Sequence, residues 1–138
     1  MAVGLRAGRV ITEIGTQRFL HCFFSTISRH LEPQGWGTVY PELMNELYQG
    51  ELDVCHMDKV LHDVLEIRDK LRSFPPNAVV WDYEDLSARP PWGDDISADI
   101  TDLSNYFVTS TGRDLFSVFI ENLEWALASG QKLTIEPV

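Results

Sequence analysis

The sequence predicts an α+β fold, in which a small mixed or antiparallel sheet of about four to five strands carries three to four helices packed mainly on one face. Three observations support this prediction. The chain has 138 residues, the size of one domain with one core, so we expect a single domain over residues 1–138. Hydrophobic residues make up 44% and charged residues 23%, as in ordinary globular proteins. Strand-like and helix-like apolar patterns follow one another along the chain.

Residues 5–14 are expected to form one bent strand or a small hairpin turning at Ala7–Gly8, because β-branched residues alternate after the glycine. A first helix of about four turns should follow from Thr16, which suits an N-cap, as far as Pro33. Its apolar side chains recur every three to four residues and should form part of the core. They are Phe19, Leu20, Phe23, Phe24, Ile27 and Leu31.

The Pro- and Gly-rich segment 33–38 predicts a loop, and a short helix is expected between Pro41 and Gly50. A long helix should then begin at Asp53, which suits an N-cap, and run up to Pro75–Pro76. One apolar stripe supports this helix. Its members are Val60, Leu61, Val64, Ile67 and Leu71.

Residues 78–81 and 106–109 are apolar and β-branched enough to predict two further strands. The loop between them is unusually long, and long ordered loops are often functional. A last helix is expected over residues 115–127 and should stop at Gly130, because the apolar residues keep helical spacing up to that glycine. Residues 132–136 alternate and predict a closing strand.

Residues 79–104 are the most distinctive segment of the sequence. They hold seven carboxylates against one cation, Arg89, which leaves a net charge of −6. Aromatic anchors surrounded by acids are typical of surfaces that capture a basic protein rather than of catalytic sites. We therefore predict that these acids bind a protein partner together with Tyr83, Trp92 and, from another loop, Trp36. The acids are Asp82, Glu84, Asp85, Asp94, Asp95, Asp99 and Asp102.

Trp36 and Trp92 occur in matching contexts, Gly-Trp-Gly and Pro-Trp-Gly. Each ring is expected either to pack on the domain as a loop plug or to stand exposed as a binding anchor. The sequence leaves both alternatives open.

The charge balance narrows the class of partner. The formal net charge is −10, whereas nucleic-acid binding relies on clustered Lys and Arg, so no nucleic-acid partner is expected. No apolar run reaches the length of a membrane helix, and Arg6 and Arg9 stand where a signal peptide needs apolar residues. We expect a cytoplasmic protein with no membrane contact, in which Cys22 and Cys55 are buried free thiols.

Catalytic and metal-binding patterns are weak. His21-Cys22 and Cys55-His56, near His62, contain zinc-ligand residue types, but neighbours on a helix project about 100° apart and cannot easily chelate one ion. Ser25, Ser28 and His30 are interpreted as helix-surface polar residues, because no acid is spaced to orient the histidine. We therefore predict no catalytic, cofactor-binding or metal-binding residue and no enzyme activity.

Two alternatives to partner binding by the acids remain open. Asp82, Glu84 and Asp85 could serve a small carboxylate-dependent enzyme, with or without a divalent metal. The chain could also be a self-associating adaptor module.

Several uncommon short sequence motifs occur one after another along the chain. They are Gly35-Trp36-Gly37-Thr38, Tyr40-Pro41, Leu43-Met44-Asn45-Glu46-Leu47-Tyr48-Gln49-Gly50, Val80-Trp81-Asp82, Pro90-Pro91-Trp92-Gly93-Asp94 and Ser104-Asn105-Tyr106-Phe107-Val108-Thr109-Ser110. In these motifs, and nearly from end to end, the chain resembles the immunity protein 70 family of bacterial polymorphic toxin systems. The combination of motifs and their order make the resemblance specific, since any one motif alone would be weak evidence.

This resemblance implies a cytoplasmic antidote that protects its producer by binding and neutralising a cognate toxin domain, without enzyme activity or a cofactor. It implies no particular contact residues, so the partner-binding residues named above rest on charge and aromatic content. The acidity of the chain agrees with such a role. Many toxin domains that attack nucleic acid are basic, and an acidic loop can occupy a groove meant for phosphates.

Overall fold

The computed structural model describes residues 2–138 and shows an α+β fold, as predicted. Over these residues a four-stranded sheet has the order β2-β1-β4-β3, and every neighbouring pair is antiparallel. The strands are β1 (Ala2–Ala7), β2 (Val10–Thr16), β3 (Glu51–Leu52) and β4 (Leu133–Pro137). The helices are α1 (Gln17–Leu31), α2 (Met57–Leu71) and α3 (Leu115–Ser129), with short turns at η1 (Leu43–Leu47), η2 (Val54–His56) and η3 (Pro76–Ala78).

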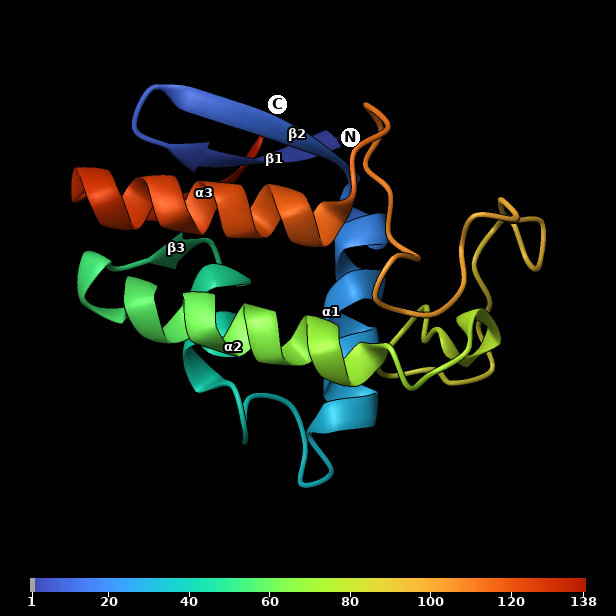
Figure 1. Cartoon of the computed structure of the whole chain (residues 1–138). Helices are drawn as coiled ribbons and strands as arrows, with labels where there is room; N and C mark the ends of the chain where they lie inside the picture. The colour runs from blue at the N-terminus through green and yellow to red at the C-terminus, as the bar shows by residue number, and fades with distance from the viewer. Residues whose placement is uncertain (1) are drawn as a thin grey trace.

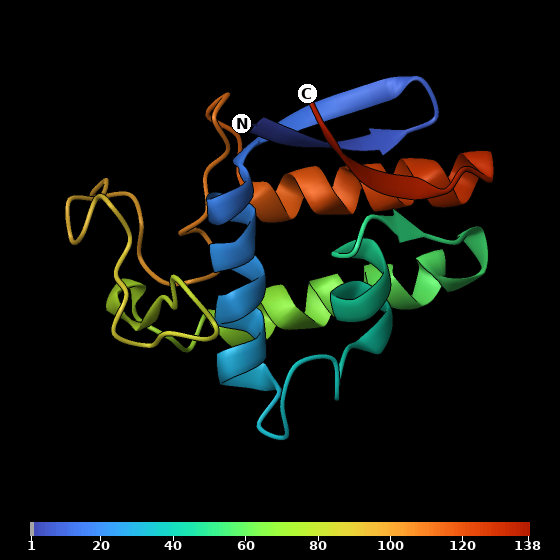
Figure 2. The ribbon, with the colours of Figure 1, turned by 180° about the vertical axis from the view of Figure 1, so that it is seen from behind.

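The sheet, α3 and α2 are stacked in that order, and α1 crosses the two helices (Figures 1 and 2). The sheet turns its buried side chains, among them Leu5 and Leu133, toward the helices, while Arg6 faces outward and pairs with Glu136 at 3.0 Å. Where α1 crosses α3, the ring of Phe23 stacks on Phe119 with 5.3 Å between centroids. The core therefore lies between the sheet and the three helices, on one face of the sheet.

The predicted hairpin and first helix are confirmed. Ala7 pairs with Val10 across a two-residue turn, in which Gly8 has a φ of +62° that glycine adopts without strain. The Thr16 hydroxyl accepts a hydrogen bond from the Phe19 amide at 3.1 Å and caps α1.

The later helices follow their expected patterns with one shift. Asp53 acts as a cap, but its carboxylate accepts from the Cys55 amide at the start of the 3-10 turn η2, and α2 begins only at Met57. The short helix expected after Pro41 is present as the π-helical turn η1. α3 ends at Gly130, which has the left-handed φ of +69°.

Both strands predicted beside the long loop are wrong. Residues 76–78 form η3, and the segment that follows bonds to side chains of α1 instead of another strand. In the second segment, only Val108 forms an isolated bridge, to Asp114. The sheet instead gains β3, whose two residues were too few to produce a pattern, and it pairs with the predicted closing strand β4.

The two cysteines differ in environment. Cys22 is buried in the core, and burial raises the pKa of its thiol to about 12. Cys55 is exposed, so the prediction that it is buried is wrong. The reason is that Cys55 lies on η2, which precedes the apolar stripe by which α2 faces the core.

Among the helices of residues 2–138, none combines the length and apolar content needed to cross a bilayer.

Candidate partner-binding surface

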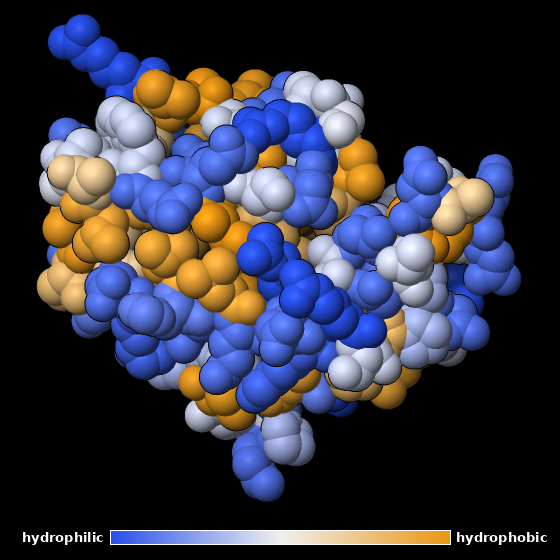
Figure 3. Space-filling view, in the orientation of Figure 1, coloured by the Kyte–Doolittle hydropathy of each residue, from blue (hydrophilic) through white to orange (hydrophobic). Residues whose placement is uncertain are grey.

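Residues 79–104, here called the acidic loop, stand out from the body of the protein beside α1, in yellow to gold in Figures 1 and 2. The loop belongs to the long connection between α2 and α3, in which η3 is the only helical turn among the described residues. Hydrophilic side chains cover much of this region in the space-filling view (Figure 3). The backbone N–H and C=O groups of a segment that pairs with no strand need other hydrogen-bond partners.

Side chains of α1 supply these partners. The Thr26 hydroxyl accepts a hydrogen bond from the Val80 amide at 3.0 Å and lies 3.2 Å from the Val80 carbonyl oxygen. The Ser25 hydroxyl accepts from the Tyr83 amide at 3.0 Å. Both Ser25 and Thr26 are fully buried. They take the place of the strand partner that the extended backbone at residue 80 lacks.

The interpretation of the polar residues of α1 as surface residues is therefore wrong for Ser25 and Ser28, which are both buried. His30 is half-buried, and its Nε2 lies 2.6 Å from the carbonyl oxygen of Ala78. The acidic loop and the residue before it are therefore attached to the polar face of α1 by hydrogen bonds. Sequence reasoning missed this because the residues that it binds are more than 45 positions away along the chain.

Trp36 and Tyr83, two of the predicted contact residues, lie together. The Tyr83 hydroxyl accepts a hydrogen bond from the Trp36 amide at 3.1 Å, and the rings meet edge-on at 5.2 Å. Arg29 lies over the Tyr83 ring at 4.1 Å from its centroid and donates to the Tyr83 carbonyl oxygen. The indole nitrogen of Trp36 donates to Met44 O at 3.1 Å. The fold thus brings residues 33–38, here called the Trp36 loop, against the acidic loop and holds both rings in place.

Trp92 is held at a second point of the loop. Its indole nitrogen donates to the Tyr106 hydroxyl at 2.7 Å, and its ring meets Trp81 edge-on at 5.5 Å and Phe19 at 6.5 Å. Trp36 and Trp92 therefore both pack on the domain as plugs, yet each ring remains partly exposed. Their contact with a partner stays a prediction.

Three of the seven acids organise the loop. Asp82 accepts from the Glu84 amide at 3.0 Å, and Asp102 accepts from the Ser104 amide at 2.8 Å. Asp85 accepts from the hydroxyl and the amide of Ser87, and these hydrogen bonds hold the pKa of Asp85 below its usual value. Such local bonds are typical of Asx turns.

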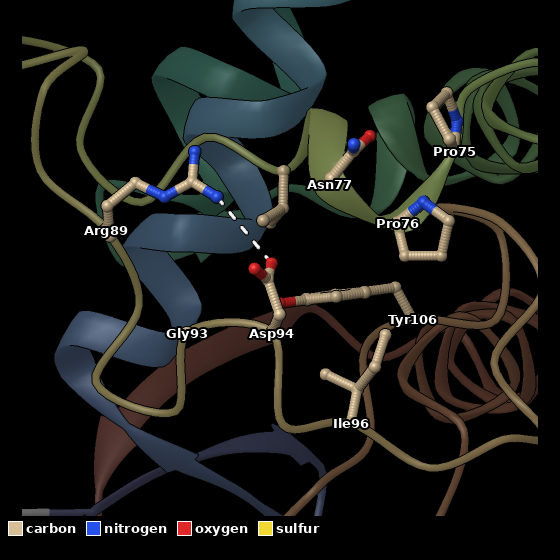
Figure 4. A pocket seen from close by; sticks show the side chains of 9 residues that line it. Pro75, Pro76, Asn77, Arg89, Gly93, Asp94, Ile96 and Tyr106 are labelled. Carbon is tan, nitrogen blue, oxygen red and sulfur yellow. Dashed lines mark ion pairs between the residues drawn. The ribbon is translucent and has the colours of Figure 1, made fainter.

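The other four acids are exposed and available for contact. Asp94 lies 3.8 Å from Arg89, a distance too long for a strong ion pair, and Figure 4 shows the two side chains pointing toward one another. The carboxylates of Glu84, Asp95 and Asp99 accept no hydrogen bond from another described residue and form no ion pair with one. The structure thus separates acids whose hydrogen bonds shape the loop, including exposed Asp85, from exposed acids whose carboxylates accept no hydrogen bond from another described residue.

Two of the hollows on this surface adjoin residues 89–100 of the loop. One, of about 350 Å³, lies between η3 and the loop and contains Arg89 and Asp94 (Figure 4). The other, here called the apolar groove, has a volume of about 370 Å³ and lies between α1 and the loop. Its apolar lining consists of Phe19, Trp92, Ile96, Ile100, Tyr106 and Val108, with Asp95 and Ser97 at its polar part. Ile96 and Tyr106 are common to both hollows.

His21 and Tyr48 also meet the acidic loop, and sequence reasoning did not single them out for this contact. His21 Nδ1 lies 2.8 Å from the Tyr48 hydroxyl and its Nε2 lies 3.4 Å from Asp82, beside a hollow of about 340 Å³. One available signal was that His21 precedes Ser25 by four residues, on the same face of α1.

A carboxylate, imidazole and phenol in series can relay a proton. Burial raises the pKa of Tyr48, and the charge of Asp82 acts in the same direction. The phenol therefore stays protonated over a wider pH range than an exposed tyrosine. Over residues 2–138, no cluster of three or more His, Cys, Asp or Glu side chains is placed to hold a metal ion.

The comparisons with known proteins agree with the resemblance of the sequence. Residues 5–135 match the model of a protein family described as immunity protein 70. No curated protein and no solved structure gives a significant match. The match spans nearly the whole chain, including α1, the Trp36 loop and the acidic loop, and it implies a role as an immunity protein against a toxin. The chain belongs to the immunity protein 70 family.

Proposed function

We propose that this protein is a cytoplasmic antidote that binds a cognate toxin domain and neutralises it through the acidic loop. The observation that carries the proposal is a group of four exposed carboxylates that accept no hydrogen bond from the described residues, on a loop whose backbone is fastened to α1. The partner that suits this surface is a basic protein domain, because opposite charges steer encounter and set orientation. The acids are Glu84, Asp94, Asp95 and Asp99.

The aromatic rings supply what the charges alone lack. Tyr83, Trp92 and Trp36 are each half-buried, so each offers part of a rigid ring to a partner. Such rings bury a large area at a low cost in side-chain entropy. The hydrogen bonds of Thr26 and Ser25 order the loop before binding, which lowers the entropy lost in the complex.

The direct test is co-expression with the cognate toxin domain, followed by measurement of growth and of association kinetics. Amide substitution at these four acids should abolish protection and slow association at low salt by about tenfold or more, while dissociation changes less. The variant is Glu84→Gln, Asp94→Asn, Asp95→Asn and Asp99→Asn. Association of the unaltered protein should also slow as salt increases.

A matched control separates the local field of the loop from total charge. It removes the same number of charges from the exposed faces of α2 and α3 and should leave protection intact. The substitutions are Asp58→Asn, Asp69→Asn, Glu121→Gln and Glu124→Gln. Full protection by a folded loop variant, or equal loss in the control, would show that the acidic loop is not the toxin-binding surface.

A further inference from the structure

The apolar groove is preformed. Trp92 and Tyr106 are tied together by their 2.7 Å hydrogen bond, and Tyr106 is only 5% exposed. Phe19 projects from α1 and packs against buried Phe107 with 6.0 Å between ring centroids. These residues cannot collapse to fill the groove, because each is held by a helix or a buried partner.

The groove also keeps apolar surface in contact with water. Val108 is 45% exposed, and Ile96 and Ile100 are half-buried. Covering such surface is favourable because it removes apolar area from water. The volume of about 370 Å³ is at the small end of ligand pockets, so it suits one or two side chains rather than a large ligand.

The charges at the groove are of one sign. Asp95 lies in its lining, which includes no lysine or arginine, and Asp94 and Asp99 flank Asp95 along the loop. The nearest cation of the loop, Arg89, belongs to the neighbouring hollow and faces Asp94. A large apolar side chain would be complementary to the walls of the groove, and a lysine or arginine next to it would be complementary to the rim.

We infer that the apolar groove receives one large apolar side chain of the toxin domain, flanked by lysine or arginine that meets Asp95 and its neighbours. This inference rests on the proposed function. It identifies the contact that slows dissociation of the complex with the toxin domain. Two other occupants fit less well. A second copy would bring one acidic loop against another, and an anionic membrane would repel the rim.

The test compares two charge-matched variants in the complex with the toxin domain. Val108→Lys places a cation in the groove, and Leu86→Lys makes the same change at a 62% exposed residue of the loop that does not line the groove. Val108→Lys should weaken binding at least tenfold, mainly through faster dissociation, whereas Leu86→Lys should change it less than threefold. Val108→Ala, which introduces no charge, should weaken binding severalfold and covers the case in which Val108→Lys does not fold.

The outcomes separate the two proposals. Equal effects of Val108→Lys and Leu86→Lys, with Val108→Ala binding as tightly as the unaltered protein, would overturn the groove inference and leave the proposed function standing. Failure of the unaltered protein to bind the toxin domain would overturn both. A dimer of the unaltered protein that Val108→Lys dissociates, seen by light scattering, would replace the toxin with a second copy as the occupant. Binding to anionic vesicles that Val108 variants lose would replace it with a membrane.

Discussion

Glu32 organises the loop that carries Trp36, so its substitution should destabilise the protein. Its side chain is 3% exposed and accepts three backbone hydrogen bonds, from Gly37 at 2.9 Å, Val39 at 3.0 Å and Tyr40 at 2.9 Å. No lysine, arginine or histidine of residues 2–138 forms an ion pair with it. The carboxylate charge is therefore balanced by backbone amides alone.

Glu32→Gln preserves the shape of the side chain but turns one acceptor oxygen into a donor. With the new amide nitrogen facing Gly37, one hydrogen bond is lost and a buried donor faces another donor. Hydrogen bonds to charged groups contribute about 1.5–3 kcal/mol each, and the two that remain are weakened to neutral bonds of about 0.5–1.5 kcal/mol. We expect the free energy of unfolding to fall by about 3.5–6 kcal/mol, a large part of the roughly 5–15 kcal/mol typical of a domain.

Urea unfolding measures this loss as a lower midpoint urea concentration, provided that the dependence of the unfolding free energy on urea concentration is unchanged. The control is Glu124→Gln on the exposed face of α3, which removes the same charge and should stay within about 0.5 kcal/mol of the unaltered protein. Equal midpoints for the two variants would show that the Glu32 carboxylate does not hold the turn, and the reasoning from buried hydrogen bonds would fail at this site.

Three further changes probe the seat of the acidic loop, a helix end and a histidine. Thr26→Val deprives the Val80 amide of its acceptor, so unfolding free energy should fall by about 1–3 kcal/mol and Val80 should exchange hydrogen faster, whereas Thr26→Ser should retain protection. Unchanged exchange would contradict this role. Gly130→Ala places a β-carbon at φ +69° and should cost about 1 kcal/mol by thermal unfolding; no loss would refute it. His56 donates a hydrogen bond to the Glu46 carboxylate, which raises the pKa of His56, so the stabilisation from this pair is present at low pH and disappears as pH rises through that pKa. NMR titration should find His56 above its usual value, and Glu46→Gln should bring it back; an ordinary value in the unaltered protein would refute the pairing.

The parts of the fold that could be predicted have local signals. α1 and α3 carry their apolar spacing and end signals within their own residues, and so does the hairpin turn at Gly8. The failed strands show where such signals end. An extended apolar segment such as that at Val80 can bond to a strand or to side chains, and here its partner is Thr26, 54 positions away. β3 spans two residues and exists only because β4 lies beside it.

The same division applies to the binding surface. The number of acids and rings between residues 79 and 104 was visible in the sequence, but their roles were not. Asp85 folds its own turn, whereas Asp95 has no donor among the described residues and faces the apolar groove. That distinction depends on which side chains the loop meets after folding, and residue type alone does not report it.

By itself the sequence determined the class of the fold, the positions of the hairpin and long helices, the excess of negative charge and the family. These properties depend on residue type and short-range spacing, which a linear chain displays directly. Only the tertiary structure decided that the polar face of α1 seats the acidic loop and that Phe19 and Val108 share one groove. The physical reason is that burial and hydrogen-bond satisfaction are properties of surfaces meeting in space, and the residues concerned lie far apart along the chain.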